Sequence, residues 1–191
     1  MQRRGPAIDE TKPLWRVMLL FLVPLMLSNV LQSASQTFTS IFLGRLLGVG
    51  ALAAASSIFP LMFFLISFFV GIASASTVLI GQAFGARDEE RLCRSAATTL
   101  SFAVVLGVIV GIVGITCDRW IMELIKTPPD VLEDAVRYAG VVFVTMPITF
   151  IWLSYTTFLR GIGDSRSPLI VLVASAIVGV VLTPALILGP L

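Results

Sequence analysis

The polar side chains that could bind a ligand gather in one apolar stretch of the chain, residues 17–44. They repeat at spacings of three and four residues, which places them on one side of a helix. The two neighbouring stripes are Ser28, Gln32, Ser35 and Thr39, and then Asn29, Ser33, Gln36 and Ser40. Amide and hydroxyl groups donate and accept hydrogen bonds without carrying a charge. The pattern predicts a helix face that lines a water-filled cavity, with hydrogen bonding between helices as the alternative.

The residue types that support catalysis or metal binding are scarce in this sequence. It contains no histidine, and its eleven Asp and Glu residues all lie outside the long apolar stretches or at their ends. A carboxylate at membrane depth normally marks the site where a transporter couples to an ion. Because the sequence offers no nucleophile–base pair and no cluster of metal ligands, we expect no enzyme activity, no catalytic residue and no metal site. No cofactor and no nucleic-acid partner are expected either.

The polar stripes lie in the first of five apolar runs that contain no charged residue. They cover 17–44, 46–86, 95–117, 138–159 and 167–191. Each exceeds the 18 or so residues that a helix needs to cross roughly 30 Å of hydrocarbon. The sequence therefore predicts an all-α, polytopic transmembrane bundle of about five spans in a lipid bilayer. After an N-terminal tail at 1–13, we expect helices at about 14–38, 51–80, 95–117, 136–159 and 168–188.

The positive charges predict the orientation of this bundle. The N-terminal tail and the even-numbered loops carry nine Lys and Arg residues, whereas the odd-numbered loops carry four. Positive residues in short loops favour the cytoplasmic side. We therefore expect the N-terminus to be cytoplasmic.

Proline and glycine mark places where the helices should bend or end. Pro24 lies within the first predicted helix and is expected to kink it. Two cytoplasmic loops carry related glycine-rich segments, at 81–88 and 160–168. We expect their residues to act as structural anchors, namely Gly81, Gln82 and Gly85 in the first loop, and Arg160, Gly161, Gly163 and Asp164 in the second.

Several segments in this order resemble the N-terminal lobe of the multidrug and toxic compound extrusion (MATE) transporters. The resemblance covers nearly everything from Leu14 to Leu191. The resemblance rests on Pro24, on the segment from Ile41 to Leu46 (IFLGRL) followed by Ala51 to Ala54 (ALAA), on Gly81 to Ala86 (GQAFGA), and on Arg160 to Asp164 (RGIGD) with Pro168. No single segment is specific, but each lies at the expected helix boundary.

The resemblance implies a protein of twelve helices in two six-helix lobes. This chain would supply helices one to five of the first lobe, without the sixth helix and the second lobe. The whole protein would be an antiporter of the bacterial inner membrane that exports drugs or organic cations by alternating access, in exchange for H⁺ or Na⁺. A natural five-helix protein remains the alternative.

One departure from the family pattern concerns ion coupling. Aligned on the segment after it, Thr39 stands where many family members carry an aspartate. Gly179 and Thr183 stand where members tend to carry an Asn and an Asp. Threonine hydrogen-bonds but does not titrate, so the usual coupling through acids of the first lobe is in doubt.

From the polar stripes and the resemblance, we predict that five residues line a substrate cavity. They are Gln32, Gln36, Thr39, Tyr155 and Thr183. Two other functions are compatible with the fold. A flippase for lipid-linked substrates is disfavoured because such proteins tend to line their cavity with arginines, and the predicted spans contain none. An inactive, truncated membrane fragment is the third possibility.

Overall fold

The computed structural model describes residues 14–42, 44–45 and 48–188, without the side chains of residues 14, 17, 20, 49, 51, 181 and 183–188. The described part forms five α-helices and one short 3₁₀-helix. Their bounds are α1 (Leu14–Phe42), α2 (Gly48–Gly85), α3 (Glu89–Leu124), η2 (Pro129–Val131), α4 (Leu132–Gly161) and α5 (Arg166–Leu188). The expected all-α architecture is confirmed.

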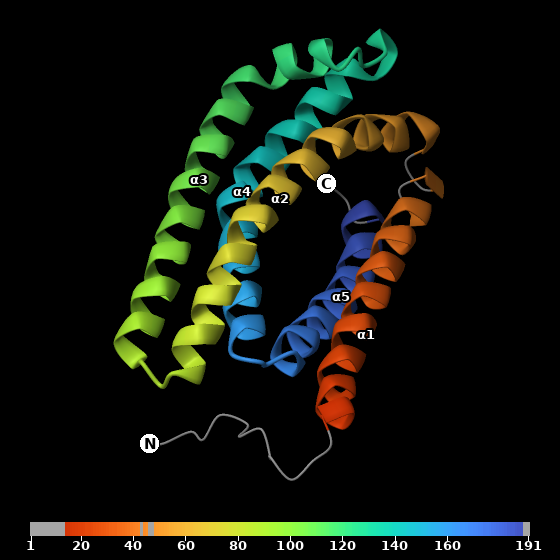
Figure 1. Ribbon diagram of the computed structural model, residues 1–191. Coiled ribbons are helices and arrows are strands. Elements are labelled where there is room, and N and C mark those ends of the chain that lie inside the picture. Colours follow the sequence, from red (N-terminus) through yellow and green to blue (C-terminus); the bar gives the residue numbers. More distant parts are fainter. Residues whose placement is uncertain (1–13, 43, 46–47, 189–191) are drawn as a thin grey trace.

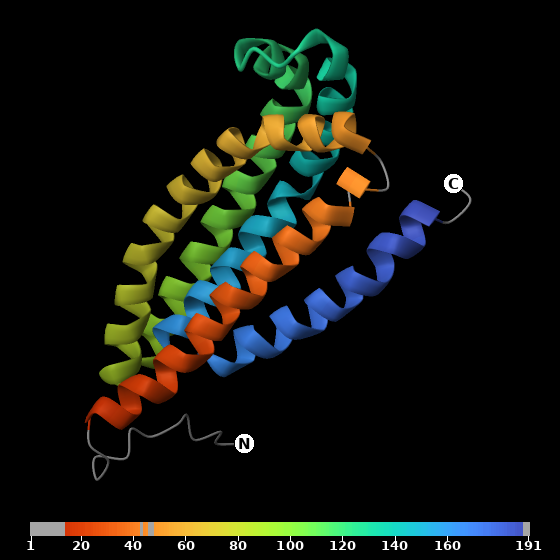
Figure 2. The same ribbon diagram turned by 90° about the vertical axis from the view of Figure 1, so that its right-hand side faces the viewer.

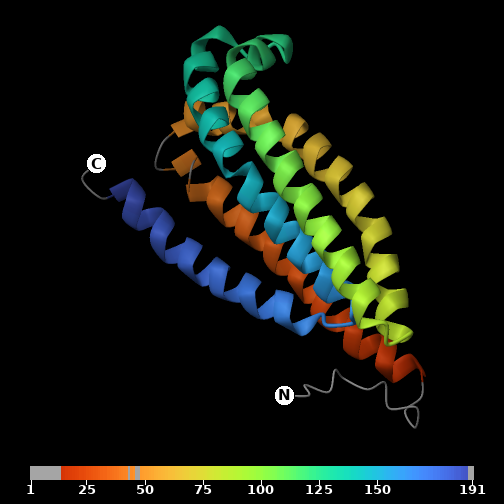
Figure 3. The same ribbon diagram turned by 90° about the vertical axis from the view of Figure 1, so that its left-hand side faces the viewer.

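The helices associate in two groups. α2, α3 and α4 pack against one another, while α1 packs mainly on α5 (Figures 2 and 3). The α2–α3 and α4–α5 connections lie at the end of the bundle where α1 begins, and the α3–α4 connection lies at the opposite end (Figure 1). The alternating loops that the sequence assigns to opposite sides of the membrane therefore lie at opposite ends of the bundle.

α2 changes direction near Pro60. Its first part lies across one end of the bundle, and the rest runs along α3 and α4 (Figure 1). Proline inside a helix removes one backbone donor, and its ring displaces the carbonyl four residues earlier, here that of Ser56. This bend sends residues before Pro60 over α1, whereas residues after it join the three-helix group.

The core of the three-helix group is built from aromatic and small residues. The rings of Phe69 on α2 and Phe150 on α4 stack with their centroids 4.5 Å apart, and both residues are buried. α3 faces α4 with buried glycines, Gly107 and Gly114 among them, which let the two backbones approach. A Cβ added at Gly107 would lie 2.6 Å from the Cα of Pro147, so only a residue without a side chain fits there.

Three helices end in the same type of cap, a residue in the left-handed region followed by a backbone hydrogen bond that spans five residues. The left-handed residues are Arg87 (φ 56°) after α2, Lys126 (φ 59°) after α3 and Gly163 (φ 80°) after α4. The bonds run from Asp88 N to Ala83 O (3.0 Å), from Thr127 N to Met122 O (3.1 Å) and from Asp164 N to Leu159 O (2.8 Å). This is the Schellman motif, which satisfies carbonyls that have no partner within the helix.

The helices extend beyond the apolar runs. α3 begins at Glu89 and ends at Leu124, whereas the sequence predicts 95–117. The additional turns carry exposed ion pairs, Glu90–Arg94 and Arg119–Glu123, both with 3.3 Å between charged atoms. Charged residues at spacing i, i+4 stabilise helix ends outside the hydrocarbon. α2 also begins earlier than the expected residue 51, at Gly48, which has a positive φ of 86° and is followed by helical backbone.

Three helical segments are long and apolar enough to cross a membrane, judged on the described residues. They are Leu52–Gly85, Glu89–Leu124 and Pro129–Gly161, and Arg166–Val180 is a shorter apolar helix. The predicted kink residue Pro24 lies inside α1, which continues through it. The hydroxyl of Ser28 donates to the Pro24 carbonyl at 2.8 Å. Whether Pro24 bends α1 stays a prediction.

Candidate functional site

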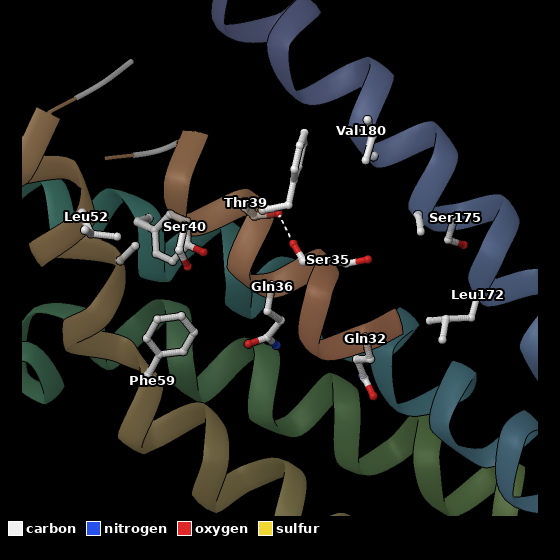
Figure 4. A pocket seen from close by; sticks show the side chains of 15 residues that line it. Gln32, Ser35, Gln36, Thr39, Ser40, Leu52, Phe59, Leu172, Ser175 and Val180 are labelled. Carbon is white, nitrogen blue, oxygen red and sulfur yellow. Dashed lines mark hydrogen bonds between the residues drawn. The ribbon is translucent and has the colours of Figure 1, made fainter. Parts of the chain in front are cut away.

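A cavity of about 350 Å³ lies where α1 and α5 meet α2 and α4 (Figure 4). It is lined by Gln32, Ser35, Gln36, Phe38, Thr39 and Ser40 of α1, Leu52, Ala55 and Phe59 of α2, Tyr138 of α4, and Leu172, Ser175, Ala176, Gly179 and Val180 of α5. The cavity therefore lies along the seam between the two helix groups.

The polar wall of this cavity comes from α1. Gln32, Ser35, Gln36, Thr39 and Ser40 reach it because they belong to two stripes separated by about one-quarter of a helical turn. The Thr39 hydroxyl donates to the backbone carbonyl of Ser35 at 3.0 Å, drawn as a dashed line in Figure 4. This bond leaves the Thr39 oxygen free to accept a hydrogen bond from a ligand.

The facing walls are mostly apolar. The bend at Pro60 brings Phe59 and Leu52 to the cavity from α2, and α5 contributes Leu172 and Val180 (Figure 4). Tyr138, near the start of α4, adds an aromatic ring with a hydroxyl group. The site can therefore contact one side of a molecule by hydrogen bonds and the other side by apolar surface.

The described side chains that line the cavity are all uncharged. Two amides, several hydroxyls and one phenol supply its polar groups. In a site of low polarity these groups hydrogen-bond a ligand but do not neutralise a charge on it.

The structure brings three of the five predicted cavity residues together. Gln32, Gln36 and Thr39 all line the cavity. Tyr155 does not line it; its side chain is 46% exposed, with its ring 6.1 Å from that of Trp152. Thr183 belongs to α5, and its side chain lies outside the described residues.

Of the α5 residues that line the cavity, the sequence pattern marks only Gly179, and it does not mark Tyr138 of α4. The α5 residues of the cavity are Leu172, Ser175, Ala176, Gly179 and Val180. Their offsets of three, four, seven and eight from the first residue mark one helical face. The chemistry of these residues does not mark the face, because Ser175 is its one polar side chain among the described lining residues. Tyr138 carries no comparable pattern, because its role depends on how α4 packs.

The two glycine-rich segments, about 80 residues apart in sequence, meet in space. A Cβ added at Gly81 would lie 3.3 Å from the carbonyl oxygen of Gly161. A Cβ at Gly161 would lie 2.7 Å from Cγ2 of Ile80 and 3.2 Å from the Thr77 carbonyl oxygen. These glycines therefore let the ends of α2 and α4 touch through their backbones. Of the other predicted anchors, Gln82 lies in the last turn of α2 with an exposed side chain, and its backbone carbonyl accepts from the N–H of Ala86 at 2.9 Å.

Asp164 holds the start of α5. Its Oδ1 accepts from the backbone N–H groups of Arg166 (3.0 Å) and Ser167 (3.1 Å), and its Oδ2 accepts from the Ser167 hydroxyl. Burial raises the pKa of the Asp164 carboxyl, but these hydrogen bonds and the charge of Arg166 outweigh it and hold the pKa below the usual 3.8. Asp88 caps the start of α3 in a similar way, because its Oδ1 accepts from the Arg91 N–H at 2.9 Å.

The fold defines a polytopic α-helical membrane protein with a cavity between its helices. Comparison with known proteins gives the family. The MatE family model matches residues 24–185, and the chain belongs to this family. Because most of the chain is matched, the predicted resemblance to MATE transporters is confirmed.

Two curated relatives illustrate the similarity. The chain is 50% identical over 181 residues to the probable multidrug resistance protein YoeA of Bacillus subtilis (strain 168), which covers 94% of this chain and 39% of that protein. It is 23% identical over 180 residues to the multidrug export protein MepA of Staphylococcus aureus (strain MRSA252), covering 94% and 40%. This chain thus spans about two-fifths of the length of these relatives.

Solved structures share the fold. A crystal structure of MATE in the bent conformation matches with a TM-score of 0.81 at 24% identity, over 91% of this chain and 39% of that one. A multidrug resistance MATE family transporter in the outward-facing conformation matches with a TM-score of 0.80, over 88% and 37%. The prediction that the helices form most of one MATE lobe agrees with this likeness.

Proposed function

We propose that this chain is part of a secondary active transporter that exports drugs and related small organic compounds across a bacterial inner membrane. The family match and the amphipathic cavity between the helix groups support the proposal. The cavity carries it, because ligand sites of transporters typically lie between helices at membrane depth. In this proposal α1, on the polar side, and α2 and α5, on the apolar side, hold the substrate while the protein alternates between inward and outward access.

The orientation and the coupling ion belong to the same proposal. The end of the bundle that holds the α2–α3 and α4–α5 connections would face the cytoplasm, as the positive charges favour. Exchange against H⁺ or Na⁺ would drive export, as the resemblance implies. Thr39 does not titrate, and the described lining residues include no Asp, Glu, Lys or Arg, so Thr39 would contribute to coupling only by hydrogen bonding.

A transport assay tests the proposal. Cells that express the full-length gene should lose a preloaded fluorescent drug such as ethidium faster than cells with an empty vector. Gln36→Ala and Thr39→Ala should slow this efflux several-fold, because each removes a hydrogen-bonding group from the cavity. Gln82→Ala is the matched control, since the exposed Gln82 side chain lies outside the cavity. Unchanged efflux in both cavity variants would contradict the assignment of the site.

Membrane vesicles separate the two coupling ions. Imposing a pH gradient alone, and then a Na⁺ gradient alone, shows which one drives uptake of the same drug into inverted vesicles. If neither gradient supports transport, the antiport part of the proposal fails.

A further inference from the structure

We propose that a groove between α2 and α3 binds one anionic glycerophospholipid, with an acyl chain in the groove and the phosphate group on Arg94. The groove is separate from the cavity of Figure 4, because the two have no lining residue in common. The proposal does not depend on which compound the protein transports.

The groove is a second cavity of about 220 Å³. Its lining includes Phe69, Ile72, Ala73 and Ser76 of α2, and Thr98 and Phe102 of α3. Phe69 is buried at its inner side, where the ring stacks on that of Phe150. Ile72 and Phe102 are 38% and 39% exposed, so the groove is open at the surface. It therefore offers a hydrocarbon chain an aromatic and aliphatic surface that is accessible from outside the bundle.

The position of the groove determines which molecule covers it. α3 lies at the edge of the bundle, on the far side of α2 and α4 from α1 and α5 (Figure 1). α2 and α3 each contain a segment that is long and apolar enough to cross a membrane. The groove lies within both of these segments, so its open side faces the hydrocarbon of the bilayer. The molecules that fill that space are lipids.

The residues along the groove follow the order of groups in a glycerophospholipid. Ser76 lies nine residues before the end of α2 and Thr98 nine residues after the start of α3, so both lie about 14 Å from the α2–α3 connection. Arg94 is one turn before Thr98, about 6 Å closer to that connection. From the connection inward, the groove thus presents a guanidinium group, then hydroxyl groups, then apolar side chains. These match the phosphate, the ester groups and the acyl chain of a lipid.

The charge of Arg94 favours an anionic lipid. Its ion pair with Glu90 (3.3 Å) is exposed, with side-chain exposures of 79% and 86%, and such a pair contributes little in water. Arg94 is therefore able to bind a phosphate group, which guanidinium binds well. The exposed Arg91 lies about 60° around the helix from Arg94, whereas Glu89 lies about 140° away. A second positive charge is thus nearer to the phosphate than this second negative one.

Lipid titration tests the proposal. The purified full-length protein, in detergent, is titrated with dioleoylphosphatidylglycerol or dioleoylphosphatidylcholine, and bound lipids are counted by native mass spectrometry. We expect the first phosphatidylglycerol to bind about fivefold more tightly than phosphatidylcholine, whose head group carries its own positive charge. Glycerol 3-phosphate, which has the phosphate but no acyl chain, should not displace it.

Matched variants on α3 locate the site. Arg94→Gln should weaken phosphatidylglycerol binding about fivefold, and Arg94→Lys should retain most of it. Arg119→Gln is the control, because Arg119 forms the same kind of exposed pair, with Glu123 at 3.3 Å, at the other end of α3. Thr98→Phe fills the groove and should also weaken binding about fivefold. Its control is Thr116→Phe, since both threonines are exposed and donate to the carbonyl four residues earlier.

Two results would overturn the proposal. One is equal phosphatidylglycerol affinity in each variant and its control, which is also the result expected if a part of the full-length protein outside this chain covers the groove. The other is displacement of the lipid by glycerol 3-phosphate, which would indicate a site for free phosphate esters. All these substitutions are at exposed positions, so they leave the buried core intact.

Discussion

Gly161 at the end of α4 lies against Ile80 of α2, with only 2.7 Å between the position of a Cβ on Gly161 and Cγ2 of Ile80. This contact joins two segments that the sequence analysis identified only as separate glycine-rich loops. It fixes the end of α4, from which α5 and one wall of the cavity begin.

Gly161→Ala should therefore destabilise the protein, because the new methyl group overlaps the branched side chain of Ile80. Overpacking of this kind costs about 1–3 kcal/mol. The measurement is thermal unfolding of the purified protein in detergent. Ile80→Ala alone should also lower stability, because Ile80 is fully buried. The double variant should lose less than the sum of the two single losses, and additive losses would show that the two residues do not interact.

Gly114→Ala should destabilise the α3–α4 contact more strongly. A Cβ at Gly114 would lie 2.2 Å from the ring of Phe143, which is buried. Gly71→Ala on α2 is the matched control, since no described atom lies within 4 Å of its added methyl group. That control should raise stability slightly, by up to about 1 kcal/mol from helix propensity. Equal effects of the two substitutions would argue against close α3–α4 packing.

Arg87→Gly and Lys126→Gly should each stabilise the protein. Both residues have positive φ, which costs an L-residue roughly 1–2 kcal/mol and costs glycine little. Part of that gain is offset because glycine has more freedom in the unfolded chain. Gly163→Ala, with φ 80° in the wild type, should have the opposite sign. Unfolding temperatures of the three variants, compared at one pH, test the assignment of these caps.

Asp164 should make stability depend on pH in the acid range. Its pKa in the folded protein lies below 3.8, so the carboxylate stabilises the folded state fully above that value. The contribution is lost as the pH falls below 3.8 and through the folded pKa. Asp164→Ala should cost about 0.5–2 kcal/mol at pH 7, as for other helix caps. The difference from wild type should shrink as unfolding is measured toward pH 3, and a difference that stays constant would exclude this linkage.

Tyr138→Phe and Tyr155→Phe should differ in their effect on ligand binding, because only Tyr138 lines the cavity. Tyr138 lines the cavity, so removing its hydroxyl should reduce binding of a hydrogen-bonding ligand, by about 0.5–1.5 kcal/mol for one such bond. Tyr155 lies outside the cavity, and its variant should bind like wild type. The readout is the affinity of the purified full-length protein for a fluorescent drug that it exports. A larger effect at Tyr155 would favour the sequence-based assignment over the cavity seen here.

The polar stripes of α1 could be predicted from the sequence, because polar residues recur there at the three- and four-residue spacing of a helix. Gln32, Gln36 and Thr39 stand out against an apolar background, and a helix of known pitch places them together. Tyr138 and the α5 wall could not be identified in that way, since their position follows from the packing of four helices. The prediction for Tyr155 could not be checked from the sequence, because nothing in it says which side of α4 faces the cavity.

The ends of the helices could also be predicted only in part from the sequence. Hydrophobic runs mark where a helix meets hydrocarbon, and they say little about where its hydrogen bonding stops. The polar turns of α3 at Glu89 and Leu124 fall outside the apolar run for that reason. The end of α3 is set by Lys126 in the left-handed region, one residue before the Thr-Pro-Pro segment that the sequence marks as a helix stop.

Because α2 bends at Pro60, one continuous helix contributes both to the wall of the cavity and to the core. Residues before it roof the cavity, and residues after it belong to the core. A ligand that pushes against Phe59 would thus transmit its force directly to the shaft of α2, with no intervening loop to absorb the motion.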